Sequence, residues 1–355
     1  MRILSTAAAT TALTATLAAP ASAEASSWTV SKGFKLGGYT SFSSMKVFSR
    51  TDVWAFGGHD EKGVAFRWNG RSWRSVPLPK RAGGAMEHVS ATSPSNLWIG
   101  SNDPGHGPYV MRWDGRRWTS RHDFPGVITG VTALGPRDLW VFGNDLGQPG
   151  AGTWHFDGRG WTKTKKMPFE VHHASAVSAK DVWAIGEGKG GPNAVGHFDG
   201  RTWRKVSPGA LLPPASSNST TYTTDVLALS AKNVWITAEI DRNASRTQYL
   251  LHWNGAKWSR EVVPSKGQPY QRVLVPDGRG GLWFLLVHAD AYSRSTPLHR
   301  DAKSHWTTGR ISGGSAIPQL RDAAVLPGTR TLLGVGDLLK RNERDADGAV
   351  FTFHG

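Results

Sequence analysis

Short apolar runs recur along most of the chain, usually opened by Asp or Asn and usually closed by glycine. Six of them carry Trp at the third position. They occupy residues 52–57, 96–100, 138–143, 181–186, 233–236, 281–284 and 331–336, and successive copies start 42 to 52 residues apart. A run such as Val53-Trp54-Ala55-Phe56 is apolar on both faces, which is typical of a strand covered by a neighbour on each side. A constant unit separated by variable loops indicates a repeat protein.

A second element follows each run, and it predicts a hairpin. An apolar strand ends in Asn-Gly or Asp-Gly, and the next strand begins with Trp. The turns are Asn69-Gly70, Asp114-Gly115, Asp157-Gly158, Asp199-Gly200 and Asn254-Gly255, and the following Trp residues are 73, 118, 161, 203 and 258, with Trp306 in the sixth copy. Such dipeptides between β-rich runs predict tight turns with a positive φ at both turn positions. With a further short strand before each run, for example 128–134, each unit is predicted to be a four-stranded antiparallel meander.

The two ends of the chain indicate that the repeats form a closed ring. Residues 350–354 match the third strand of the seventh copy, whose fourth strand is missing at the C-terminus. Near the N-terminus, Ser27-Trp28-Thr29-Val30 resembles an isolated fourth strand. Pairing the two segments would complete the last unit and remove an exposed sheet edge. We therefore predict an all-β fold, a seven-bladed β-propeller of four-stranded antiparallel blades, with the last blade closed by the N-terminal strand.

The blade repeats are expected near residues 40–80, 81–122, 123–168, 169–212, 213–265 and 266–312, with 313–355 plus 27–32 forming the last blade. The 17 Trp residues all fall in predicted second, third or fourth strands. Blades radiate from an axis, so the space between them widens outward and needs large side chains there. We expect these Trp residues to pack in the core, which makes an aromatic sugar-binding surface unnecessary to explain most of them.

The first residues predict export. Arg2, a mild apolar stretch over residues 3–19 and the Ala21-Ser22-Ala23 site indicate a signal peptide at 1–23, followed by a single propeller domain at 24–355 that is secreted.

The chain has no cysteine, so disulfides and thiolate metal sites are excluded. Without the signal the mature chain has 41 basic and 27 acidic residues, a net charge of +14. This excess favours anionic partners, such as an acidic polysaccharide or cell-wall polymer. We expect no specific nucleic acid, no membrane span, no cofactor and a monomer.

The Asp-Val-Trp-Ala-x-Gly runs, followed by His-Trp-Asp-Gly-like turns and Trp, resemble secreted bacterial propellers of the kelch or galactose-oxidase central-domain type. The resemblance covers most of the mature chain, most clearly residues 40–260. It implies the fold and does not imply an activity.

Candidate chemistry lies on the loops that join second to third strands and fourth to first strands, where propellers usually meet ligands. Equivalent positions ahead of the repeated Trp run hold Glu87-His88, His172-His173 and Asp225, and we expect His88, His173 and Asp225 to converge around the axis. His59, His106 and His288 are expected on neighbouring loops of the same face. Tyr222, Tyr270 and Arg272 come from the longest inserts. These eleven residues are the predicted ligand-binding or catalytic set.

Three interpretations of this set stay open. A polysaccharide lyase or glycoside hydrolase could use His88, His173, Tyr222 or Tyr270 for proton transfer, with Arg272 pairing a uronate. Neutral imidazoles could support a metal. The histidines could also make only local hydrogen bonds. We predict a secreted propeller that binds an extracellular ligand, an anionic glycan or cell-wall polymer, through its loop face; an enzyme acting on an acidic glycan and a protein-interaction platform are the alternatives.

Overall fold

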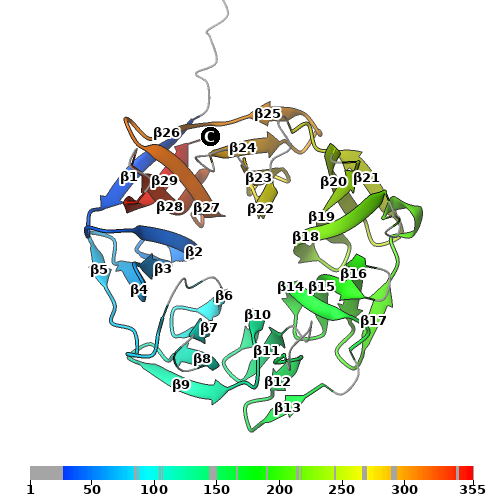
Figure 1. Ribbon diagram of the computed structural model, residues 1–355, viewed down its shortest axis with the longest axis horizontal. Coiled ribbons are helices and arrows are strands. Elements are labelled where there is room, and N and C mark those ends of the chain that lie inside the picture. Colours follow the sequence, from blue (N-terminus) through cyan, green and yellow to red (C-terminus); the bar gives the residue numbers. More distant parts are fainter. Residues whose placement is uncertain are drawn as a thin grey trace, which may run out of the picture.

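A computed structural model describes residues 27–354 except 84–85, 87, 104, 106, 144–149, 165–166, 189–190, 213–215, 217, 244, 266–269, 289–293 and 341–343. The predicted signal peptide therefore lies outside the described residues. The chain forms seven sheets arranged as blades around a central axis, as Figure 1 shows. The innermost strands are β2, β6, β10, β14, β18, β22 and β27. The predicted seven-bladed propeller is confirmed.

The strands of each blade follow one another along the chain, so every blade is an antiparallel meander. Blade 1 is β2 (Thr40–Ser49), β3 (Asp52–His59), β4 (Lys62–Trp68) and β5 (Trp73–Ser75). Blade 2 is β6 (His88–Ser93), β7 (Asn96–Asp103), β8 (Gly107–Trp113) and β9 (Trp118–Asp123). Blade 3 is β10 (Ile128–Gly135), β11 (Asp138–Gly143), β12 (Trp154–Phe156) and β13 (Trp161–Lys163). Blades 4 and 5 are β14 (Glu170–Ser178), β15 (Asp181–Gly188), β16 (Gly191–Phe198) and β17 (Trp203–Val206); and β18 (Ser219–Ser230), β19 (Asn233–Arg242), β20 (Ser245–Trp253) and β21 (Trp258–Val262).

Blade 6 is β22 (Tyr270–Pro276), β23 (Leu282–Val287), β24 (Ser295–Arg300) and β25 (Trp306–Thr308), and blade 7 contains β27 (Ile317–Val325), β28 (Thr331–Leu339) and β29 (Ala346–His354). One short 3₁₀ helix, η1 (Gly209–Leu211), follows β17. Within the described part of the chain, no helix has the length and hydrophobicity needed to cross a bilayer.

Strand β1 (Ser27–Phe34) supplies the fourth strand of blade 7. It pairs antiparallel with β29, with Trp28 opposite Phe353 and Phe34 opposite Gly348. This confirms the predicted closure of the ring by the N-terminal strand. The structure adds a fifth strand that the sequence did not predict: β26 (Arg310–Ser312), in the connection between blades 6 and 7, pairs parallel with the outer edge of β1. The added strand covers the first residues of an edge that would otherwise be open.

The predicted form of the hairpin turns is wrong in one respect. Trp68 is opposite Trp73, so the loop between third and fourth strands has four residues rather than two. Only the glycine of each turn has a positive φ, for example 91° at Gly70, whereas the preceding Asn or Asp does not. The Asn69 Oδ1 accepts hydrogen bonds from the N–H groups of Arg71 and Ser72. The Asx residue is therefore selected because its side chain satisfies two backbone donors of the turn, not because it adopts a left-handed conformation.

Buried apolar residues that the structure describes form seven clusters, one between each pair of neighbouring blades. In six of them a second-strand Trp of one blade packs against the next blade. Trp54 meets Trp118 edge-on at 6.3 Å, Trp140 meets Trp203 at 5.7 Å, and Trp183 meets Trp258 at 5.9 Å between ring centroids. The 17 Trp residues lie in second, third and fourth strands as predicted. The chain has no cysteine, so burial of these and other apolar side chains stabilises the fold without any help from disulfides.

Candidate functional site

The inner strands bring the predicted site residues into equivalent places. His88 on β6, His173 on β14 and Asp225 on β18 each stand opposite the residue two positions after the second-strand Trp, namely Gly100, Ile185 and Thr237. In the blades of His173 and Asp225 a register shift immediately precedes this position. The equal spacing in the sequence therefore corresponds to equivalent cross-strand positions in these three blades.

Of these three, the structure brings together His173 and Asp225. The His173 Nδ1 lies 3.9 Å from the Asp225 Oδ1, with side chains 56% and 15% exposed. Burial raises the pKa of Asp225 above its ordinary value, and the nearby imidazole of His173 opposes this rise. His88 lies on β6, two blades before β14.

Asp225 also has a structural task that explains its place. Its two carboxylate oxygens accept hydrogen bonds from the N–H of Val226, at 2.8 Å, and from the N–H of Leu274 in blade 6, at 2.7 Å. The carboxylate therefore ties the inner strand of blade 5 to that of blade 6. Charge-assisted hydrogen bonds of this kind are the stronger class of protein hydrogen bond.

Asp322 occupies the same place in blade 7, opposite Val335, and was missed in the sequence. It accepts hydrogen bonds from the N–H of Ala323 and from the N–H of Met45 in blade 1, and burial raises its pKa as well, with Lys46 opposing. Its spacing to the following repeat, nine residues before Thr331, was the available signal. Two blades thus use an aspartate to hold the next inner strand.

Other predicted histidines make local hydrogen bonds. The His59 Nδ1 lies 2.9 Å from the Thr40 hydroxyl, and the His288 Nε2 lies 2.9 Å from the Thr296 hydroxyl. His172 occupies the register shift beside His173, and burial lowers its pKa. Glu87 and His106 lie outside the described residues. Arg272 is part of β22, but its side chain is not among those described.

Two exposed tyrosines mark the loop face of blades 5 and 6. Tyr222 on β18 and Tyr270 on β22 are 39% and 48% exposed. The Arg246 guanidinium of β20 lies 4.0 Å from the centre of the Tyr270 ring, which is a cation–π distance. Arg246 also pairs with Glu239 at 2.5 Å and with Asp241 at 3.7 Å. Burial raises the pKa of Glu239 to about 6, and the charge of Arg246 opposes this rise.

A small polar pocket adjoins Tyr222. Its volume is about 230 Å³, and it is formed by the start of β18 and by the turn between β19 and β20. The lining residues are Asn218, Ser219, Thr220, Tyr222, Asp241 and Asn243. Thr220 is the cross-strand partner of Asp241, and Tyr222 is that of Glu239, so these four side chains share one face of the sheet. Asn243 has a φ of 51°, a conformation that Asn tolerates better than most residues and that shapes the tight turn. The pocket presents amide, hydroxyl and carboxylate groups beside an aromatic ring.

The structure also shows a repeated histidine arrangement that the sequence reasoning did not recognise. In blades 3, 4 and 6 a third-strand His bonds an Asp and stacks on the second-strand Trp. The Asp opens the second strand in blades 3 and 4, and in blade 6 it lies in the turn between β22 and β23. The pairs are His155 with Asp138, His197 with Asp181 and His299 with Asp277, with rings 4.4, 4.5 and 4.6 Å from Trp140, Trp183 and Trp283. His252 bonds Asn233 and stacks on Trp235 in blade 5 in the same way. Arg67 and Arg112 replace the His in blades 1 and 2.

The signal for this arrangement is the constant place of the His or Arg, two residues before the turn Asx. It assigns four of the histidines to the architecture of the blades. Among the described residues, no group of three or more His, Asp or Glu side chains has the geometry to hold a metal ion.

No known family model matches this sequence, and no curated protein matches it either. Solved structures do match. YCF48 bound to D1 peptide is 12% identical, with a TM-score of 0.58, over 95% of this chain and 100% of the other. YCF48 from Cyanidioschyzon merolae is 14% identical, with a TM-score of 0.56, over 92% of this chain and 99% of the other. The N-terminal domain of Nup159 is 12% identical, with a TM-score of 0.53, over 93% of this chain and 96% of the other.

At these identities the comparisons bear on the fold. Together with the sheet order they define the class of protein: this chain is a seven-bladed β-propeller. Its resemblance to kelch-type propellers is one of fold.

Proposed function

We propose that this protein is exported and binds an extracellular glycan through the loop face of blades 5 and 6. The observation that carries the proposal is the polar pocket beside Tyr222. A sugar offers hydroxyl groups around a ring with an apolar face. The Asn218, Thr220, Asp241 and Asn243 side chains supply donors and acceptors of the matching kind, and the exposed Tyr222 ring supplies a surface for the sugar face.

The proposed preference for an acidic glycan or cell-wall polymer rests on the charge of the whole protein. The chain carries 42 Lys and Arg residues against 27 Asp and Glu residues. Such an excess attracts polyanions over distances up to the Debye length, about 10 Å at 0.1 M salt. Asp241 lines the pocket itself, so we expect the acidic groups of the polymer to lie outside the pocket, over the surrounding surface.

An enzyme acting on such a glycan is the second candidate. The observation in its favour is Glu239, because a carboxyl group with a pKa of about 6 suits general acid–base chemistry near neutral pH. Glu239 is, however, only 7% exposed and is paired with Arg246. This environment suits a structural ion pair better than a group that reaches a substrate, so binding is the proposal and catalysis is an outcome of its test.

Binding can be tested with the mature protein, residues 24–355, on immobilised polygalacturonate, wall teichoic acid and neutral dextran at low and high salt. We expect salt-sensitive retention on the acidic polymers. Tyr222→Ala should weaken it about 3- to 10-fold, the equivalent of a lost aromatic contact. Leu229→Ala is the matched control, because Leu229 lies at the other end of β18 and is 41% exposed.

Three results would contradict the proposal: no retention on any polymer, retention that Tyr222→Ala and Leu229→Ala change equally, or stronger retention on dextran. Ultraviolet absorbance from unsaturated uronates, or new reducing ends, that disappear in His173→Ala or His88→Ala would establish the enzyme instead. Secretion is tested separately by sequencing the N-terminus of the exported protein, which we expect to begin at Glu24.

A further inference from the structure

The seam between blades 7 and 1 lacks the tryptophan that fills the other six. Leu333 on β28 stands opposite Ala324 and Thr352, as Trp183 on β15 stands opposite Ser175 and His197. Leu333 is therefore the residue at the Trp position of the seventh repeat. The six Trp residues at this position are buried, with at most 7% exposed, whereas Leu333 remains partly exposed.

The next blade still has the ring surface that a second-strand Trp would meet. In blade 2 the partners of Trp54 are Trp113 and Trp118, and the corresponding residues of blade 1 are Trp68 and Trp73. Leucine is smaller than tryptophan and cannot fill the gap. What remains is a cavity of about 280 Å³ between Trp68, Trp73 and Val53 on one side and Leu333, Leu326 and Val350 on the other.

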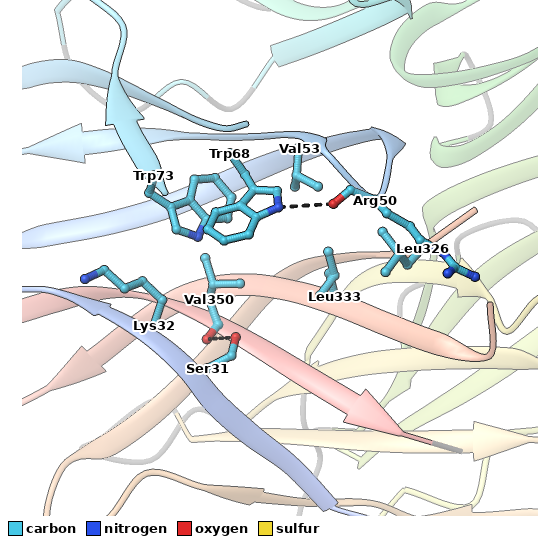
Figure 2. A pocket seen from close by; sticks show the side chains of 9 residues that line it. All are labelled: Ser31, Lys32, Arg50, Val53, Trp68, Trp73, Leu326, Leu333 and Val350. Atoms are coloured by element: carbon cyan, nitrogen blue, oxygen red, sulfur yellow. Dashed lines mark hydrogen bonds between the residues drawn. The ribbon is translucent and has the colours of Figure 1, made fainter. Parts of the chain in front are cut away.

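Figure 2 shows how these side chains lie. The Trp68 and Trp73 rings face Val350 and Leu333 across the cavity, while Lys32 and Arg50 stand near its two ends. The Trp68 ring is held by a hydrogen bond from its Nε1 to the Arg50 carbonyl oxygen at 3.1 Å. The Arg50 guanidinium donates to the Gly328 carbonyl oxygen of blade 7 at 3.0 Å, so it spans the seam beside the opening. The walls are mostly apolar, and both charged side chains are cationic.

We propose that this cavity binds a small planar aromatic carboxylate. The aromatic ring takes the place that an indole occupies in the six other seams, between the blade 1 tryptophans and Leu333. The carboxylate pairs with Arg50 or Lys32 at an end of the cavity. Small-molecule sites have volumes of about 300–1,000 Å³. The volume of this cavity, about 280 Å³, lies just below that range. A sugar is a poor occupant, because the apolar walls offer few partners for its hydroxyl groups. The site lies on blades 7 and 1 and is separate from the Tyr222 pocket of blade 5.

Indole-3-acetate is a suitable probe. Uncharged indole, which lacks the carboxylate, is the control compound. We expect saturable calorimetric binding of indole-3-acetate to the mature protein, together with a change in Trp fluorescence. Leu333→Trp should abolish binding by filling the cavity. Val262→Trp is the control, because it adds an indole at an exposed position of blade 5. Arg50→Gln should lower the affinity for indole-3-acetate about tenfold and leave the affinity for indole unchanged.

Absence of saturable binding would overturn the proposal, and so would binding that Leu333→Trp leaves intact. Equal affinity for indole and indole-3-acetate, unaffected by Arg50→Gln and Lys32→Gln, would overturn the proposal that the cavity recognises a carboxylate. If Leu333→Trp does not fold, Leu333→Phe provides the same test with a smaller ring. Glycan retention by Leu333→Trp is expected to stay at the level of the unaltered protein, so failure here is distinguishable from failure of the glycan proposal.

Discussion

Trp28 and Phe353 come from opposite ends of the described chain and are cross-strand partners, with ring centroids 5.5 Å apart. Trp28 also meets Trp283 of blade 6 edge-on at 5.6 Å. The contact that closes the ring is therefore also part of a seam between blades, and its loss is expected to destabilise both.

Replacement of Trp28 should be among the most damaging single changes. Trp28 is fully buried, so we expect Trp28→Ala to lower the free energy of unfolding by about 3–5 kcal/mol. Urea unfolding followed by fluorescence and circular dichroism measures this effect. Lys35→Ala, an exposed position just after β1, is the control and should change stability by less than about 0.5 kcal/mol. An unfolding midpoint of Trp28→Ala equal to that of the control would argue against closure by this strand.

Glycine at the end of the second-strand run is required by the close approach of the inner strand. A Cβ at Gly186 would lie 1.7 Å from the Glu170 carbonyl oxygen, which is backbone and cannot rotate away. We expect Gly186→Ala to cost about 1–3 kcal/mol in thermal or urea unfolding. Gly160→Ala is the matched control, since nothing lies within 4 Å of its Cβ position. Equal stability of the two variants would show that the inner strand can shift without cost.

The stacked histidine pairs should stabilise the blades. His197 bonds Asp181 at 2.7 Å and lies over Trp183, and the Asp181 side chain is only 14% exposed. His197→Ala leaves this carboxylate without its partner, and we expect a loss of about 1–3 kcal/mol. His305 and Asp301 form a similar pair at 3.1 Å that is far more exposed, so His305→Ala should cost no more than about 0.5 kcal/mol. A larger loss of stability in His305→Ala than in His197→Ala would contradict this interpretation.

Glu239 should make stability depend on pH. Burial raises its pKa from 4.5 to about 6, so the folded protein holds a proton that the unfolded chain has released between these values. Stability contributed by this group therefore falls as pH rises from about 4.5 to 6 and stays low above it. A shift of this size corresponds to about 2 kcal/mol at most. Glu239→Gln should remove this part of the pH dependence, as measured by urea unfolding from pH 4 to 8. A pH profile unchanged by the substitution would contradict the raised pKa.

Part of the candidate site was readable from the sequence, because a repeat carries its own register. Equal spacing to the next Trp run put His88, His173 and Asp225 in equivalent places, and the inner strands pair accordingly. Asp322, which was overlooked, stands nine residues before its run at Thr331, whereas the other three stand eight residues before theirs. The spacing does not show which backbone groups each carboxylate faces. The hydrogen bonds of Asp225 and Asp322 go to the next blade, and a linear pattern does not show which strand lies there.

The polar pocket beside Tyr222 and the cavity beside Leu333 depend on packing. Tyr222 was identified in the sequence, but Asp241 and Asn243 join it only through the pairing of β18 with β19 and the turn after β19. The substitution of Leu333 for Trp is visible in the repeat, yet its consequence requires the position of Trp68 and Trp73 in the neighbouring blade.

By itself the sequence determined the blade count, the strand order, the closure by Trp28 and the burial of the tryptophans. The blade count, the strand order and the burial follow from a local pattern that recurs along the chain, so that weak signals in single copies support one another. The closure follows from the fourth strand that is missing from the seventh copy and present near the N-terminus. The tertiary structure alone decided which side chains meet across a seam, the shape of the four-residue turns and the extra strand β26. The contacts across a seam depend on distances between blades, which are set by the volume of side chains packed around the ring and not by any one segment of the chain. The turn shape depends on hydrogen bonds from backbone N–H groups to the Asx side chain, which the dipeptide alone does not show.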